Sequence, residues 1–344
     1  MLGRRHRIGL DWSGTSVKAV RIVLSGGRAR ITHAIAGAAR GSSRAGAVLR
    51  QGGIRAFGAE VRAAVPEEDL HVHELEMPIV SAAELRSMLP FEVRRHAALD
   101  AGGDWAMAHE VRGRDEATGR LSVVVAVAPR RGIESSRETW ARSGFLPRRL
   151  EPGPVAALNH ILHDPATRSD GSCRALLDVG ETGSWLVVHR EDAPLFCRRL
   201  SIGGQQFTYE LMERGGFERA EAEEVKRGEI ALGRARPDWR ERPPLLAELV
   251  RSSAARLADE AREQLEIYRR RNGPVRELFL AGGGAILPGL DLILDRRLAL
   301  PARVVDPFES IELPPKWSEK ERDFLRGQAP RFLTAVGLTA WWSP

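Results

Sequence analysis

Alternating apolar and polar residues predict β-strands near the beginning of the chain. Residues 16–24 (SVKAVRIVL) and 28–37 (RARITHAIAG) flank a Ser-Gly-Gly turn, an arrangement typical of a β-hairpin. Residues 60–66 and 69–78 show similar strand patterns and predict two further strands. The continuous apolar run within residues 120–130 (RLSVVVAVAPR) predicts a buried strand.

Helical patterns alternate with these strands, so the predicted fold class is α/β. Ser81 and Glu84 form a capping-box pattern at the start of a helix over residues 81–99, in which Pro90 predicts a kink. A longer helix is expected over residues 245–271, where apolar residues recur on one stripe. Residues 234–244 (RARPDWRERPP) predict a loop. Further helices are expected from about Ile133, over residues 205–215 and 217–228, and near residues 332–342.

The two halves of the chain begin with similar patterns. Residues 7–37 and 175–204 each contain an apolar run, an aspartate, small residues with glycine and hydroxyls, and then two strands separated by a polar turn. The aspartates are Asp11 and Asp178, which lie 167 residues apart, or about half the chain length. A repeat at the head of each half predicts a duplication with two lobes of similar plan.

Composition and charge argue against several functional classes of protein. The chain has 344 residues, a net charge of +6 and a pI of about 9.9, but its arginines are scattered among acids and form no basic-aromatic module, so we expect no nucleic-acid partner. Cys173 and Cys197 form no CxxC pair and fit reduced core thiols of a cytosolic protein. No apolar run approaches the ~18 residues of a membrane helix, so we expect no transmembrane segment.

Three loops that follow predicted strands have the composition of phosphate- and nucleotide-binding turns. Glycine and hydroxyl residues after a strand present backbone N–H groups and O–H donors to phosphate oxygens, whereas an aspartate there suits a Mg²⁺ shell, usually through water. Asp11 and Asp178 each head one such loop, and a run of three glycines (282–284) after a third strand leaves room for a flat ligand. The chain has no GxxxxGK[ST] motif, so it is not a P-loop protein.

The order of these loops resembles that of the actin-like ATPase superfamily, and within it the sequence resembles the PilM family of type IV pilus assembly; it is also similar to the cell-division protein FtsA. The resemblance extends over almost the whole chain. It is carried by IGLDWSGTSVKAVRI, ELEMPIVSAAELRSMLPFEVRRH, LLDVGETGSWLVVHREDAPLFCRRLSIGGQQFT, AEAEEVKRG, LFLAGGGAILPGLDLIL and ARVVDPF.

The resemblance implies an actin-like fold of two duplicated lobes with a nucleotide cleft between them. The first lobe would span residues 1–163 and contain a small inserted subdomain at about residues 77–128. The second would span residues 172–344, with a final helix that packs back on the first lobe.

The resemblance also implies that the cleft binds ATP with Mg²⁺. Asp11 and Asp178 would hold the metal, in keeping with their carboxylates, and Glu223 and Lys226 would meet the ribose and base, although a solvated helical ion pair is the alternative for these two. The nucleotide-binding residues implied are Asp11, Ser13, Gly14, Thr15, Ser16, Lys18, Asp178, Gly180, Thr182, Ser184, Gly203, Gly204, Glu223, Lys226, Gly282, Gly283, Gly284 and Leu287.

The sequence departs from the superfamily at the position of the catalytic base. Hydrolysing members carry a carboxylate or Gln there, whereas the aligned residues here are Pro152 or Gly153, and Glu151 is the nearby acid. Glu151 is therefore the catalytic candidate, and we expect at most a weak ATPase, because hydrolysis without a positioned base is slow. Trp12 stands where the family usually has a smaller residue and would either narrow the phosphate pocket or fill the core.

The leading functional hypothesis is an ATP-binding cytoplasmic scaffold at the inner membrane. The PilM resemblance implies that it binds the short cytoplasmic tail of a PilN-like inner-membrane protein, with Met88, Phe91 and Val93 as candidate contacts, although internal packing of these residues is equally open. Other pilus components could be further partners. The alternatives are an FtsA-like membrane-associated actin homologue, for which the basic C-terminal helix is lacking, and a small-molecule kinase, for which an acidic base beside a substrate pocket is lacking.

Overall fold

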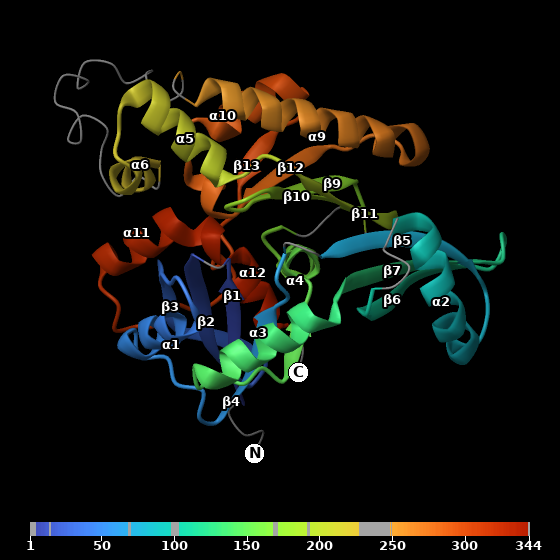
Figure 1. Ribbon diagram of the computed structural model, residues 1–344, viewed down its shortest axis with the longest axis horizontal. Helices are drawn as coiled ribbons and strands as arrows, with labels where there is room; N and C mark the ends of the chain where they lie inside the picture. The colour runs from blue at the N-terminus through green and yellow to red at the C-terminus, as the bar shows by residue number, and fades with distance from the viewer. Residues whose placement is uncertain are drawn as a thin grey trace.

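The computed structural model contains two five-stranded sheets and a smaller three-stranded sheet (Figure 1). It describes residues 5–13, 15–67, 70–97, 103–167, 171–190, 193–226, 248 and 250–342. The predicted loop at residues 234–244 and the first residues of the helix predicted from Leu245 lie outside this described part, and the long helix α9 runs from Arg251 to Asn272. No helix among the described residues is both long enough and apolar enough to span a bilayer.

The first sheet has the strand order β3-β2-β1-β4-β8. Strand β1 pairs antiparallel with β2 on one side and parallel with β4 on the other. The two faces of this sheet bury separate apolar clusters, as expected for a sheet covered by helices on both sides. The strands are β1 (Arg5–Trp12), β2 (Ser16–Ser25), β3 (Arg28–Ala38), β4 (Ala59–Ala64) and β8 (Arg149–Glu151).

The second sheet repeats this plan with the strand order β11-β10-β9-β12-β13. Strand β9 pairs antiparallel with β10 and parallel with β12, as β1 does with β2 and β4. Asp11 lies near the end of β1 and Asp178 near the end of β9, so the two aspartates occupy corresponding positions. This correspondence confirms the predicted duplication. The strands are β9 (Arg174–Val179), β10 (Ser184–Arg190), β11 (Ala193–Leu200), β12 (Glu277–Ala281) and β13 (Ala302–Val304).

Helices α4 (Gly153–His163) and α12 (Leu333–Thr339) lie between the sheets (Figure 1). Every residue of α12 is buried, and the helix packs against α4 and against β1, β2 and β4 of the first sheet. Close approach of the helices requires a glycine, because a Cβ atom at Gly337 would lie 2.0 Å from the carbonyl oxygen of Ala156. The last helix therefore packs on the first lobe.

The three-stranded sheet has the order β5-β7-β6, with β5 (His71–Pro78), β6 (Trp105–Asp115) and β7 (Arg120–Pro129). One face packs on helix α2 (Ala82–Ala97), and the other shares a core with β10, β11 and α4. The predicted capping box is present: the Glu84 carboxylate accepts from the Ser81 backbone N–H at 2.9 Å. Helix α2 continues through Pro90.

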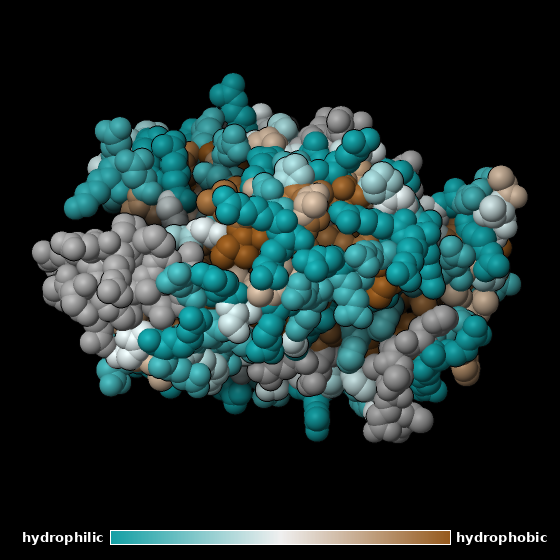
Figure 2. Space-filling view, turned by 90° about the horizontal axis from the view of Figure 1, so that it is seen from above, coloured by the Kyte–Doolittle hydropathy of each residue, from teal (hydrophilic) through white to brown (hydrophobic). Residues whose placement is uncertain are grey.

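Most of the remaining helices cover the outer faces of the two large sheets, whereas α11 (Glu319–Gln328) packs with α12 on the inner face of the first sheet. The stripe predicted on α9 is buried in the core of the second lobe at Leu257, Ala261, Leu265 and Tyr268. The outer surface above α9 is mostly hydrophilic, with apolar residues visible in gaps between charged side chains (Figure 2). The remaining helices are α1 (Ser42–Gln51), α3 (Arg130–Arg142), α5 (Gly204–Gly215), α6 (Arg219–Lys226), α9, α10 (Leu290–Leu298) and α11, with short 3₁₀ helices η2 (Gly283–Ile286) and η3 (Ala329–Phe332).

Candidate functional site

Two adjoining cavities form a cleft where the two large sheets meet. One has a volume of about 230 Å³ and the other of about 390 Å³. Both are lined by residues of the first loop, the second loop and the glycine run, so they are two parts of one cleft. The shared lining residues are Ser13, Lys18, Gly180, Glu181, Gly283 and Arg331.

The first loop is a tight turn between β1 and β2. The backbone N–H of Ser13 donates to the carbonyl of Ser16 at 3.1 Å, and this turn places the hydroxyls of Ser13 and Thr15 at the cleft. The Lys18 ammonium lies 3.0 Å from Oδ2 of Asp11. Of the residues predicted here, Gly14 lies outside the described part of the chain, and the others line one or both cavities.

The second loop is fastened to the start of helix α5. The N–H of Gly204 donates to the Gly180 carbonyl at 2.7 Å, and the N–H of Gln205 donates to the Glu181 carbonyl at 2.9 Å. Gly180 and Thr182, two of the residues implied to bind nucleotide, line the smaller cavity. The hydroxyl of Ser184 instead donates to the carbonyl of Ile202 at 2.6 Å and is buried. Ser184 therefore shapes the loop from inside the protein.

The two neighbouring glycines Gly203 and Gly204 likewise differ in whether they line the cleft. Gly204 lines the larger cavity, whereas Gly203 is not among the described residues that line either cavity. The N–H of Gly203 donates to the side-chain oxygen of Gln206 at 2.9 Å, at the first turn of α5. Gly203 therefore helps to position this end of the helix.

The third loop brings its glycines against Asp178. Gly282 has φ +84°, a conformation that L side chains rarely adopt, and a Cβ atom there would lie 2.3 Å from Oδ1 of Asp178. Gly283 lines both cavities, and Gly284 lines the larger one. Leu287, which the resemblance implied to be a nucleotide-binding residue, is 2% exposed and belongs to the core of the second lobe.

Glu223 and Lys226 line the larger cavity from helix α6. They form the ion pair expected from their spacing, with 2.7 Å between Lys226 Nζ and Glu223 Oε1. Lys226 also donates to the Gly204 carbonyl at 3.1 Å and to the Thr208 hydroxyl at 2.7 Å. The pair thus lies in the cleft and also ties α6 to α5, so it is not a solvated surface pair.

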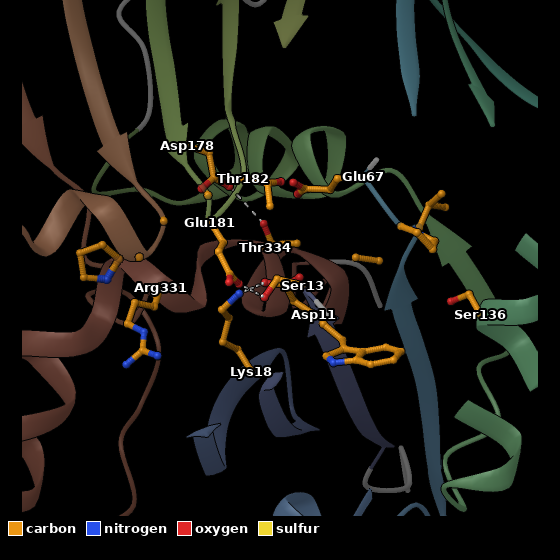
Figure 3. Close-up of a pocket in the computed structure, with 18 of the residues that line it drawn as sticks. Asp11, Ser13, Lys18, Glu67, Ser136, Asp178, Glu181, Thr182, Arg331 and Thr334 are labelled. Carbon is orange, nitrogen blue, oxygen red and sulfur yellow. Dashed lines mark hydrogen bonds and ion pairs between the residues drawn. The ribbon is translucent and has the colours of Figure 1, made fainter. Parts of the chain in front are cut away.

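Three carboxylates lie close together at the smaller cavity: those of Asp11, Asp178 and Glu67 (Figure 3). Burial and the nearby Asp11 charge raise the pKa of Asp178 to about 6. Burial, followed by the negative charges of Asp11 and Asp178, raises the pKa of Glu67 to about 7. Crowded carboxylates favour a cation, and carboxylates are hard oxygen ligands, so Asp11 and Asp178 fit Mg²⁺.

Glu67 was missed by the sequence reasoning. It follows β4, the parallel neighbour of β1, and therefore emerges at the same edge of the sheet as Asp11. An acid directly after that strand was the signal that could have found it. In Figure 3 its carboxylate points toward Thr182 and Asp178.

Glu151, the catalytic candidate, does not line either cavity in the described structure. Its Oε1 atom lies 3.5 Å from Nη1 of Arg62. Burial raises its pKa, and Arg62 opposes this shift. Its position therefore suits an ion pair at the end of β8, whereas Glu67 lines the smaller cavity.

Trp12 combines the two roles considered for it. Its ring lines the smaller cavity and also contacts Trp140 edge-on, with 6.0 Å between ring centroids. The indole N–H donates to the Ala39 carbonyl at 3.0 Å, which fixes the ring. Trp12 therefore narrows one end of the cleft as a fixed wall.

The candidate peptide-contact residues of α2 differ in exposure. Phe91 is 70% exposed, Met88 is partly buried, and Val93 is fully buried in the core between α2 and the small sheet. Val93 therefore packs internally and cannot contact a peptide while this core is intact. Phe91 is the large apolar side chain of the three that solvent reaches.

The comparisons with known proteins agree with this architecture. The family model described as "Type IV pilus assembly protein PilM" matches residues 153–340. A solved structure described as "PilM-PilN type IV pilus biogenesis complex" is similar, with a TM-score of 0.81 and 21% identity, and the match covers 98% of this chain and 99% of that chain.

Two other solved structures are more distantly similar. The ethanolamine utilization protein EutJ from Carboxydothermus hydrogenoformans matches with a TM-score of 0.53 and 13% identity, over 99% of this chain and 91% of that chain. A diol dehydratase-reactivating factor in nucleotide-free form matches with a TM-score of 0.53 and 11% identity, over 98% of this chain and 99% of that chain.

These likenesses confirm the predicted actin-like ATPase fold. The family match covers more than half of the chain and includes the second loop, the glycine run and the final helix. The chain therefore belongs to the PilM family of type IV pilus assembly proteins.

Proposed function

We propose that this chain is an ATP-binding cytoplasmic scaffold of type IV pilus assembly. One observation carries the nucleotide site: Asp11 and Asp178, from corresponding strands of the two lobes, line one cavity together with the glycines at 282 and 283. The hydroxyls of Ser13 and Thr15 and the backbone of the second loop would hold phosphate oxygens. The larger cavity, with Glu223 and Lys226, would take the adenosine.

Mg²⁺ would be held by Asp11 and Asp178, largely through water, and would neutralise charge on the phosphates. The Lys18 ammonium, 3.0 Å from Asp11, would orient that carboxylate. Turnover would be slow, because Glu151, the acid nearest the aligned base position, does not line either cavity. Glu67 is the described carboxylate best placed to orient a water molecule near the phosphates.

The scaffold role is the binding of a PilN-like tail. The solved structure that resembles this chain is described as a PilM-PilN complex, and Phe91 offers an exposed aromatic residue on the small subdomain. A short tail cannot fold alone and gains pairing and apolar contacts from its host. Through this partner the chain would be held at the cytoplasmic face of the inner membrane.

The segment 333–342 weighs against an FtsA-like membrane anchor formed by these residues. Helix α12 is buried, the Trp341 indole N–H donates to Nδ1 of His160 at 3.0 Å, and Trp342 stacks on His163 with 4.6 Å between ring centroids. These residues therefore pack against α4.

The test is a pull-down with a synthetic peptide of the cytoplasmic tail of a PilN-like protein from the same organism. Binding in the low micromolar range with ATP and Mg²⁺ present is the expected result. Absence of peptide binding by a folded protein that binds ATP would overturn the scaffold role. Absence of ATP binding, measured separately with a fluorescent ATP analogue, would overturn the nucleotide site.

A further inference from the structure

The side chain of Glu181 crosses the cleft from the second loop to the first. Its Oε2 atom accepts a hydrogen bond from the Ser13 hydroxyl at 3.1 Å and another from the Thr15 hydroxyl. In Figure 3 the carboxylate points away from Asp178 and toward Ser13 and Lys18. Glu181 thus joins two loops that belong to different lobes.

The two hydroxyls that Glu181 engages are donors that the nucleotide site needs. A hydroxyl carries one proton, so it cannot donate to a carboxylate and to a phosphate oxygen at the same time. A carboxylate and a phosphate are both anions, and they repel each other at short range. Glu181 therefore competes with a phosphate group in two ways. Its carboxylate takes the same hydroxyl donors, and its negative charge repels the phosphate.

The backbone around Glu181 is fixed, so its side chain is the part that can move. The Glu181 carbonyl accepts from Gln205 at 2.9 Å, and the preceding carbonyl, of Gly180, accepts from Gly204 at 2.7 Å. Glu181 lines both cavities, which gives the side chain space on either side of its present contacts.

We propose that Glu181 is an internal competitor for the phosphate groups of the nucleotide. In the nucleotide-free chain its carboxylate links the two loops, and binding of the phosphates displaces it and replaces the link with the nucleotide itself. This inference rests on the nucleotide site proposed above. It implies that the chain binds ATP more weakly than its loops alone would allow.

The experiment compares the parent with Glu181→Gln, Glu181→Ala and a control, Glu263→Gln, which changes an exposed glutamate on α9. A fluorescent ATP analogue is titrated with Mg²⁺ present. We expect both Glu181 variants to bind about tenfold more tightly, equivalent to 1.4 kcal/mol, and the control to bind like the parent. Adenosine, used as a competitor, should bind equally to all four proteins because it carries no phosphate.

A second measurement uses hydrogen exchange without nucleotide. Backbone amides of residues 15–18 should exchange faster in Glu181→Ala than in the parent, because alanine has no side-chain acceptor for the Ser13 and Thr15 hydroxyls and the link between the lobes is lost. Unchanged exchange in Glu181→Ala would overturn the link.

The binding results separate this proposal from the nucleotide site itself. If the parent binds ATP and neither Glu181 variant binds more tightly, the competition is overturned while the site stands. If the variants bind and the parent does not, the competition is supported in its strongest form. If none of the proteins binds, both the site and the competition fail.

Discussion

The Oδ1 atom of Asp178 lies so close to Gly282 that a Cβ atom at residue 282 would be 2.3 Å from it. The carboxylate at the end of β9 is therefore seated against the backbone of the third loop. This contact joins Asp178, at the smaller cavity, to the glycine run, and only Gly282 of the three glycines makes it.

The fold should tolerate a side chain at residue 283, whereas ligand binding should not. Among the described residues no atom lies within 4 Å of the place a Cβ would take at Gly283, and this residue lines both cavities. Gly283→Val should fill the cleft without unfolding the protein and weaken binding of an ATP analogue at least about tenfold.

Gly284→Val is the matched comparison for that variant. Its Cβ would lie 2.3 Å from a methyl group of Val179, so overpacking should lower the free energy of unfolding by about 1–3 kcal/mol. Thermal melting separates the two effects. Equal melting temperatures, or full ligand binding by Gly283→Val, would contradict the geometry of this loop.

Asp11→Asn should weaken ATP binding mainly in the presence of Mg²⁺. The substitution removes a charge that would hold the metal and leaves the side-chain volume nearly unchanged. We expect at least about a tenfold loss with Mg²⁺. Without Mg²⁺ we expect little loss, because the amide no longer repels phosphate.

Calorimetric titrations with Mg²⁺ and with a chelator measure this difference, and Glu263→Gln again serves as the control. An equal loss under both conditions would assign Asp11 to positioning of the loop rather than to the metal.

Glu67→Gln should reduce ATP turnover while ATP binding is retained. We expect parent turnover far below the ~10 per second of a median enzyme. The variant should lose a further factor of about 100, because an amide can orient an attacking water molecule but cannot take up its proton as a carboxylate does. Phosphate release and analogue binding are measured on the same samples. Unchanged turnover in Glu67→Gln would exclude this carboxylate from hydrolysis.

Phe91→Glu should weaken binding of the PilN-like tail peptide, and Phe57→Glu should not. Both phenylalanines are exposed, at 70% and 93%, but Phe91 lies on α2 and Phe57 lies in the first lobe between α1 and β4. Phe57→Glu therefore controls for the loss of an exposed aromatic residue and for the added charge. Similar losses in both variants would argue against a contact at α2.

His189 should make the fold sensitive to acid. It is 3% exposed on β10, and burial, followed by the charges of Arg174 and Arg112, lowers its pKa from 6.5 to about 4. Between these values the unfolded chain binds a proton that the folded chain does not, so stability falls as pH falls from 6.5 to 4.

The expected contribution of His189 is about 2–3 kcal/mol over this range. His189→Leu should remove that part of the pH dependence, as measured by urea unfolding at several pH values. An unchanged slope would show that His189 is already protonated in the folded protein.

Local patterns predicted the α/β class and many of the elements, because strand alternation, a capping box and glycine turns are properties of neighbouring residues, whereas the actin-like fold was implied by the family resemblance. The repeated aspartate loops located most of the cleft for the same reason. Glu181 and Glu67 were missed because their importance arises from contacts across the molecule: Glu181 meets Ser13, which lies 168 residues away in sequence. Ser184 and Leu287 carry suitable chemistry at suitable spacings, but the neighbouring core determines that they point inward.

The burial of helix α12 also bears on how the chain is made. The guanidinium of Arg7 donates to the carbonyl of Thr339, across 332 residues, and α12 covers the sheet that contains β1. During synthesis that sheet must therefore wait, with part of an apolar face uncovered, until nearly all of the described chain has left the ribosome. Such long-range closure is slow and exposes nascent chains to aggregation, so folding in the cell should depend on chaperones that shield the first lobe until its last helix arrives.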